Sequence, residues 1–163
     1  MVRQRTAYAA AVLVIAAAVL LYLLALHLQH GSAYQQAPVH GPEGNFPVGR
    51  ISIGNSSYNV YIAANAALQE QGYMNSSSIG SCGGLGNCAG MLFLFRNYST
   101  ECFWMKNTIM ALKQSWIANG TVNYTYIGTP YSTAIICSPG NMVLETLPAF
   151  PIRQGEKVLY TGV

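Results

Sequence analysis

The sequence predicts a mostly β domain, a compact antiparallel β sandwich or barrel with one short helix, preceded by a single transmembrane helix. Three observations support this prediction. A nearly uninterrupted apolar run occupies Ala7–Leu28, short alternating segments of β-branched and aromatic residues follow Arg50, and Gly, Pro and Asn-Gly turn signals separate those segments. Of the 163 residues, roughly 115 remain for one modest globular domain.

The apolar run at residues 7–28 is long enough to cross a bilayer once. At 1.5 Å rise per residue, a helix of this length spans about 33 Å. Arg3 and Arg5 precede the run, and the first basic residue after it is Arg50. The positive-inside bias therefore places residues 1–6 in the cytoplasm and the domain outside the cell membrane, as a single-pass protein.

A cleaved signal peptide is the competing interpretation, because Gly31–Ala33 resembles a small-residue cleavage site. The apolar core, however, exceeds the 7 to 15 residues that are typical of signal peptides. We expect an uncleaved signal-anchor. Residues 29–49 are rich in Gly, Pro, Gln and His and predict a flexible linker, which leaves residues 50–163 as the extracytoplasmic β domain.

Sequons and cysteines both agree with an exported domain. Five Asn-x-Ser/Thr sequons make the chain a candidate glycoprotein, although an Asn- and Ser-rich set of turns is the alternative. The sequon asparagines are Asn55, Asn75, Asn97, Asn119 and Asn123. The even number of cysteines indicates disulfide bonds. Of the three connectivities, we favour Cys82 with Cys88, on proximity, and Cys102 with Cys137, tying a strand to a later loop.

The first part of the domain reads as a hairpin followed by a helix. Two alternating apolar segments, Ile51–Ile53 and Tyr58–Ile62, flank a Gly-Asn-Ser-Ser turn. Asn65 can cap a short helix at Ala66–Gln71, and Gly72 provides its C-terminal stop.

The middle of the domain alternates loops and strands. A Ser- and Gly-rich loop at Asn75–Ala89 leads into the apolar run Met91–Phe95, which is typical of a strand buried on both faces. Residues Arg96–Glu101 are expected to turn the chain, and Cys102–Lys106 to be extended again.

The last part contains the strongest short hairpin signal in the chain. Leu112–Ala118 and Thr121–Ile127 flank the Asn119-Gly120 pair. Two further strands are expected at Met142–Leu147 and Lys157–Tyr160. About eight short strands in all are typical of a sandwich or barrel.

Several motifs, taken in order, resemble the domain of unknown function 192 family, also called uncharacterised protein family 0127. They are Gly72-Tyr73-Met74, which echoes the family's Gly-Leu-Met, then Gly90–Phe95, Phe103–Thr108, Val143–Glu145 and Pro148-Ala149. The stretch Phe-Trp-Met-Lys-Asn-Thr is the specific match. The resemblance implies a compact, mainly antiparallel β fold, often exported, with no established biochemical activity.

The resemblance covers roughly residues 51–160 and has two departures. Where the family pattern has Pro-Leu-Asp-Ile, this chain has Ala111–Gln114, so Lys113 replaces an acid. The arginine that typically precedes the Gly-Leu-Met motif is replaced within Leu68–Gln71. Because Lys113 stands in place of the family's acid, no role of that acid can be carried over to this chain.

Trp104, Lys106 and Asn107 are the best candidates for ligand binding. On one face, an indole, an ammonium and a carboxamide can stack on a sugar or aromatic ring and bind its polar edge. Strand alternation places Trp104 and Lys106 opposite Phe103 and Met105, which we assign to the core. The competing interpretation buries Trp104 in the core and makes Asn107 a turn residue.

Glu145 is the fourth candidate for the ligand site. It can form a cross-strand ion pair with Lys106, or supply the acid of an enzyme. A lone Glu near a Lys is more often structural, so we favour a domain that is not an enzyme.

Composition excludes several classes of site. All five acidic residues are Glu, and the three histidines, His27, His30 and His40, lie in or just after the apolar run. This rules out a Ser-His-Asp triad, a Cys-His pair and a His-built zinc site in the domain. The Gly-rich segment Gly80–Gly90 lacks the Gly-Lys-Ser/Thr of a phosphate loop. No metal or cofactor is predicted.

Charge argues against nucleic acid as a partner. Beyond the apolar run, the chain has six basic and five acidic residues, which gives a net charge of only +1. The predicted partners are instead the membrane itself, an envelope glycan or subunits of a membrane complex.

The leading hypothesis is a membrane-anchored extracytoplasmic β domain that binds a cell-envelope ligand or partner. One alternative is an enzyme acting on envelope glycans or peptides, with Glu145 or Glu101 as its acid. Another is an accessory subunit of a larger membrane complex, whose helix packs through the small residues Ala9–Ala11 and Ala16–Ala18.

Overall fold

The computed structural model describes residues 18–23, 41–42 and 45–162. The chain divides into two units, Met1–Pro38 and Val39–Val163. Residues 18–23 are helical, and no helix within the described residues has the length and apolarity needed to cross a membrane. The predicted cytoplasmic segment, most of the predicted transmembrane helix and most of the predicted linker lie outside the described residues.

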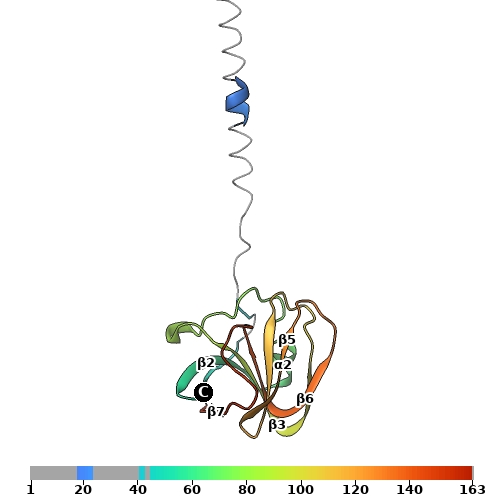
Figure 1. Ribbon diagram of the computed structural model, residues 1–163. Coiled ribbons are helices and arrows are strands. Elements are labelled where there is room, and N and C mark those ends of the chain that lie inside the picture. The colour runs from blue at the N-terminus through green and yellow to red at the C-terminus, as the bar shows by residue number, and fades with distance from the viewer. Residues whose placement is uncertain (1–17, 24–40, 43–44, 163) are drawn as a thin grey trace, which may run out of the picture. The chain divides into compact units, whose positions relative to one another are not determined.

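A single seven-stranded sheet forms the second unit, and it curls into a half-barrel (Figure 1). Along the sheet the strand order is β5-β4-β6-β3-β2-β1-β7. The strands are β1 Val48–Ile53, β2 Ser56–Ala63, β3 Gly90–Phe103, β4 Leu112–Ala118, β5 Thr121–Gly128, β6 Ile136–Thr146 and β7 Val158–Tyr160. The helical elements of this unit are α2 Ala66–Gln71 and the 3₁₀ turn η1 Gly83–Leu85. The predicted mostly β class with one short α-helix is confirmed for this unit.

The two edge strands of the sheet meet at one end. Thr121 of β5 forms an antiparallel bridge with Lys157, next to β7. The backbone amide of Val158 donates to the carbonyl of Gly120, and that of Val122 to the carbonyl of Glu156, each at 2.9 Å. These bonds pair backbone groups that an open sheet would leave exposed at its edges.

One strand pair departs from the predicted antiparallel arrangement. β2 and β3 run parallel, with Tyr61 opposite Met91 and Ala63 opposite Phe93. A tight hairpin can join only antiparallel strands, whereas the long segment between β2 and β3 carries α2 and η1 and returns the chain to the same end of the sheet.

Local signals place the short elements as predicted. Asn65 caps α2, because its Oδ1 accepts from the amide of Leu68 at 3.0 Å. Gly72 ends the helix with φ 43°. Asn119 and Gly120 have φ 51° and 72°, which are the positive values that a two-residue hairpin turn between β4 and β5 requires.

The prediction of a turn at Arg96–Glu101 is wrong. β3 continues without a break to Phe103, with a register irregularity between Leu94 and Ser99. This half of β3 extends beyond β2 and pairs with β6 alone, so its side chains are largely exposed. Polar residues suit such an exposed position. The two strands predicted here are one, which reduces the expected eight to seven. β6 also begins at Ile136, before the predicted Met142.

Two apolar clusters lie on opposite faces of the sheet. The cluster inside the curl receives residues from all seven strands: Ile51, Ile53, Val60, Ile62, Leu92, Ile117, Val122, Leu144 and Val158, together with Ile152. The outer cluster joins central strand residues Met91, Phe93, Leu112, Trp116 and Val143 to the covering residues Phe46, Tyr73, Ile79, Cys82, Cys88 and Met105. Through the contacts of the outer cluster, α2 and its neighbouring loops cover the outer face of the sheet.

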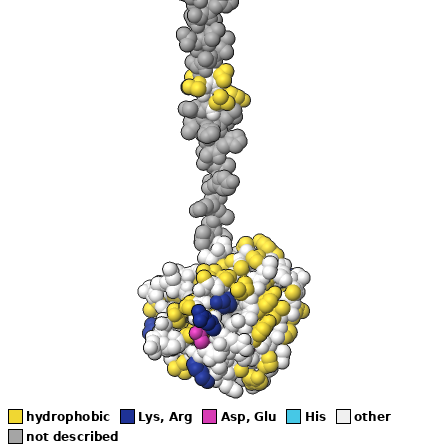
Figure 2. Space-filling model, viewed as in Figure 1, with side chains coloured by type: hydrophobic (Ala, Val, Ile, Leu, Met, Phe, Trp, Pro, Cys, Tyr) yellow, Lys and Arg dark blue, Asp and Glu magenta, His cyan; other side chains and the backbone are white. Residues whose placement is uncertain are grey.

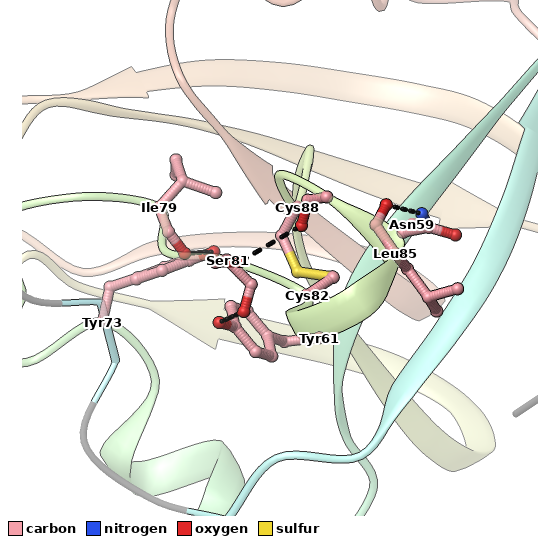
Figure 3. The surroundings of a disulfide bond; sticks show 9 residues. Asn59, Tyr61, Tyr73, Ile79, Ser81, Cys82, Leu85 and Cys88 are labelled. Atoms are coloured by element: carbon pink, nitrogen blue, oxygen red, sulfur yellow. Dashed lines mark hydrogen bonds between the residues drawn. A yellow bond between two sulfur atoms is a disulfide. The ribbon is translucent and has the colours of Figure 1, made fainter.

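Both predicted disulfides are present. Cys82–Cys88 closes the loop around η1, and two hydrogen bonds hold this loop to β2 (Figure 3). Asn59 Nδ2 donates to the carbonyl of Leu85 at 3.0 Å, and Tyr61 Oη to that of Ser81 at 2.6 Å. The second disulfide joins Cys102 to Cys137 at directly paired positions of β3 and β6. Cys137 therefore lies in a strand, not in the loop that was predicted.

Candidate functional site

A cavity of about 290 Å³ lies on the outer face of the sheet, where α2 approaches the end of β3. Its walls come from the C-terminal part of α2 and the residues after it, from β3, and from the turn that follows β3. Three of the four predicted ligand-binding residues line it: Trp104, Lys106 and Glu145. Folding thus brings Glu145 of β6 close to Trp104 and Lys106 of the Phe-Trp-Met-Lys motif.

Trp104 and Lys106 form a pair at the rim. The chain leaves β3 at Phe103 and turns, with the amide of Thr108 donating to the carbonyl of Met105 at 3.1 Å. Trp104 keeps 43% of its surface exposed, and Lys106 Nζ lies 5.0 Å from the centroid of its ring. This distance permits a cation–π contact.

The assignment of Phe103 and Met105 to the core is confirmed. Met105 is buried, and Phe103 packs edge-on against Phe93 with ring centroids 4.9 Å apart. The alternation of inward and outward side chains continues past the end of the strand, so Trp104 and Lys106 still point outward.

Asn107 lies apart from this group. Its φ of 58° is left-handed, a conformation that Asn tolerates better than most residues. Its carbonyl accepts from the amide of Asn75 at 2.8 Å, which ties the turn to the segment after α2. Asn107 is not among the residues of the cavity wall, so the structure places it as the turn residue of the competing interpretation.

Glu145 is almost fully buried, with 4% of its surface exposed. Gln114 faces it across β4 and β6 and donates from Nε2 to Glu145 Oε1 at 3.0 Å. Burial raises the pKa of this carboxyl from 4.5 to about 7, although the hydrogen bond from Gln114 acts in the opposite direction. Among the described residues, these contacts replace the ion pair expected between Glu145 and Lys106.

Tyr73 lines the cavity, although the sequence analysis named it only as part of a family motif and not as a site residue. It is 2% exposed and donates from Oη to the carbonyl of Ile79 at 3.4 Å. Burial raises its pKa well above 10, and the nearby charges of Glu145 and Tyr61 add to the effect. The available signal was the tyrosine at the position where the family motif Gly-Leu-Met has leucine.

The chemistry of the cavity suits a ring with polar edges. The walls include Phe93, Phe95 and Phe103, the rim carries the Trp104 indole, and a carboxyl lies among them. Near neutral pH that carboxyl is partly protonated, so it can donate as well as accept a hydrogen bond. Within the part of the chain that the structure describes, no group of three His, Cys, Asp or Glu is placed to hold a metal ion.

Lys113, which stands where the family offers an acid, does not line the cavity. Its Nζ donates to the carbonyl of Phe150 at 2.6 Å. Its strand neighbours Leu112 and Gln114 are the residues that face the outer cluster and Glu145. Lys113 therefore makes a structural contact and adds no group to the cavity.

The sequon asparagines differ in accessibility. Four of them, Asn55, Asn75, Asn97 and Asn119, are exposed. Asn123 is half-buried, and its Nδ2, the atom that would carry a glycan, donates to the carbonyl of Pro139 at 2.6 Å. Four of the five sites are thus open to modification in the folded domain.

Charged side chains on the face shown in Figure 2 are few, and the acidic group there lies beside basic groups. This view contains no broad basic patch of the kind that binds nucleic acid.

The domain is therefore a curled β sheet that carries a buried carboxyl, Glu145, at a cavity beside α2. Residues 50–155 match the family DUF192, uncharacterized ACR. The chain belongs to this family, as its motifs suggested.

Two solved structures are similar to the chain. One comes from Sinorhizobium meliloti 1021 and is described as a proposed transcription regulator; it has 26% identity and a TM-score of 0.63, over 72% of this chain and 97% of that one. The other, a protein of unknown function from Novosphingobium aromaticivorans, has 23% identity and a TM-score of 0.61, over 78% and 96% of the two chains. No curated protein matches the chain.

Proposed function

We propose that this chain is a membrane-anchored, extracytoplasmic binding module for a cell-envelope saccharide, held in the cavity beside α2. The observation that carries the proposal is the meeting of Trp104, Lys106 and Glu145 at one cavity. Residues of these types recognise a ring that has one apolar face and several hydroxyl groups.

Each side chain has a separate role in this proposal. The exposed Trp104 ring stacks on the apolar face of the sugar. Lys106 Nζ, already beside the indole, donates to a hydroxyl at the rim. Glu145 binds a second hydroxyl at depth, where a hydrogen bond is stronger because water is excluded. The cavity volume of about 290 Å³ suits one ring better than a long chain.

An enzyme acting on the same saccharide is the second candidate. A pKa of about 7 at Glu145 is the property that a general acid needs near neutral pH. Glu101 also lines the cavity and offers a second carboxylate. We rank binding first, because the aromatic and basic groups at the cavity suit the holding of a ring, whereas a lone buried Glu is more often structural than catalytic.

We do not propose gene regulation, the role in the description of the Sinorhizobium protein, for this chain. The part beyond the apolar run has a net charge of only +1, which offers little attraction to phosphate backbones.

Calorimetric titration of the full chain in detergent with envelope saccharides tests the proposal. We expect Trp104→Ala to weaken binding by at least tenfold, while Tyr98→Ala, an exposed aromatic residue of β3 that does not line the cavity, leaves it unchanged. Equal affinities for both variants and the native chain would contradict a site at this cavity.

The same samples separate the alternatives. Release of a cleaved saccharide that is lost in Glu145→Gln would favour the enzyme. Co-purification of a stoichiometric membrane protein from native membranes, without saccharide binding, would favour the accessory subunit.

A further inference from the structure

Four large apolar side chains project from two neighbouring segments of the domain. Trp104 and Ile109 belong to residues 104–109, with 43% and 41% exposure, and Tyr131 and Ile135 to residues 129–135, with 62% and 64%. We call these four residues the loop face. Other apolar side chains also gather in patches on the side of the domain drawn in Figure 2.

Backbone hydrogen bonds hold the two segments together. The amide of Met105 donates to the carbonyl of Ser132 at 3.1 Å, and the amide of Tyr131 to that of Thr108 at 3.0 Å. The two segments that carry the loop face are therefore joined to each other and are not independent loops.

Tyr131 has an unfavourable backbone conformation. Its φ is 60°, a value that is uncommon for a residue with a bulky ring. The bond to Thr108 compensates for part of this cost, yet the ring remains exposed to solvent. Such strain is commonly retained where a side chain has a function.

The charge pattern identifies the occupant. Lys106 is the single charged residue in segments 104–109 and 129–135, which otherwise contain apolar, hydroxyl and amide side chains. Trp and Tyr favour the boundary between lipid headgroups and acyl chains, aliphatic residues enter the acyl region, and Lys reaches lipid phosphates.

We infer that the loop face docks onto the surface of the lipid bilayer that carries the chain. This inference rests on the proposed membrane anchor at residues 7–28. Sixteen residues, 29–44, would separate that anchor from the first continuous part of the described domain. A chain of this length reaches about 55 Å at most, so the domain stays near the bilayer and a weak interfacial contact is sufficient.

Docking also specifies the ligand more closely. Trp104 belongs both to the loop face and to the cavity wall, and Lys106 lines the cavity beside it. The mouth of the cavity then opens at the level of the lipid headgroups. A saccharide carried on a lipid is the form of the ligand that reaches it there.

Tryptophan fluorescence of the full chain in vesicles tests the inference. The protein has two tryptophans, and Trp116 has no exposed surface, so quenching by a shallow spin-labelled lipid reports on Trp104. In vesicles of phosphatidylcholine and phosphatidylglycerol, we expect at least twofold more quenching in the native chain than in Trp104→Phe. Equal quenching in these two proteins, with Trp104 still open to aqueous iodide, would overturn docking.

Variants outside the cavity wall separate docking from ligand binding. Tyr131→Asn, which tolerates the positive φ, and Ile135→Ser are expected to halve the lipid quenching of Trp104, while saccharide affinity in detergent stays unchanged. Leu159→Ser, an equally exposed site on β7, serves as the matched control. If Leu159→Ser lowers quenching as much as the other two variants do, the loop face is not the docking surface.

Two further outcomes identify other occupants. Protection of Trp104 from iodide without lipid, together with concentration-dependent dimerisation, would assign the face to a second copy and overturn the inference. Failure of the full chain to float with vesicles would overturn the anchor and docking together, while leaving saccharide binding in detergent to be judged by its own titration.

Discussion

Glu145 is the residue whose chemistry depends most on its surroundings. Its side chain is buried at the cavity wall, and its carboxyl receives one hydrogen bond from Gln114. Burial raises its pKa to about 7 from 4.5, so the folded chain retains a proton that the unfolded chain loses between these values. The free energy of unfolding is highest below pH 4.5 with respect to this group, and it falls as pH rises to 7.

Glu145→Gln should remove this dependence on pH. The amide resembles the protonated acid and can still accept from Gln114, so the variant loses no stability from this group as pH rises. For the native chain the loss between pH 4.5 and 8 is about 3 kcal/mol, or about 10 °C in Tm. Thermal unfolding at several pH values measures it, with Glu70→Gln, at an exposed position, as the control. Parallel slopes for native chain and Glu145→Gln would refute the raised pKa.

The two tryptophans should respond in opposite ways to truncation. Trp104 is 43% exposed, whereas Trp116 has no exposed surface and donates from Nε1 to the carbonyl of Glu101 at 2.8 Å. We expect Trp104→Ala to change the free energy of unfolding by less than about 1 kcal/mol, and Trp116→Ala to lower it by roughly 3 to 5 kcal/mol. Urea denaturation distinguishes them, and a large loss for Trp104→Ala would assign Trp104 to the core.

At the scale of elements, α2 links stability to the cavity. Its C-terminal part forms one cavity wall, and its start depends on the Asn65 cap. The segment has only 6 residues, too few for an isolated helix to be stable in water.

Asn65→Ala should therefore destabilise the domain by about 1 kcal/mol and weaken saccharide binding as the helix frays. Asn65→Asp keeps an oxygen acceptor at the cap and should preserve both properties. Hydrogen exchange of the α2 amides and calorimetric titration measure the two effects. Unchanged protection in Asn65→Ala would show that packing alone holds the helix.

Element prediction succeeded where the signal was local and failed where it was not. The Asn119-Gly120 turn and the Asn65 cap act within a few residues, and both lie where they were expected. The polar half of β3 was taken for a turn, because its strand character depends on pairing with β6, which comes much later in the chain.

At the scale of the whole molecule, our proposal depends on a membrane anchor at residues 7–28. We expect the apolar run at residues 7–28 to remain on the mature protein, because its length exceeds that of a signal-peptide core. Intact-mass measurement of membrane-extracted, deglycosylated protein should start at residue 1 or 2 and show two disulfides. A mature start near Tyr34 would contradict the anchor and leave the domain free in solution.

By itself, the sequence determined the mostly β class, the hairpins and the capped helix. It only favoured the two observed cysteine pairings, and it placed Trp104 and Lys106 opposite Phe103 and Met105 without deciding whether Trp104 is exposed. These features follow from periodicity, turn chemistry and recognisable motifs. Only the tertiary structure decided the parallel β2–β3 pair, the curl of the sheet, the contact of Gln114 with Glu145 and the meeting of Glu145 with the Trp104 rim. The physical reason is that each of these depends on contacts between segments far apart in the chain, and local propensity carries no information about which distant strand a residue will face.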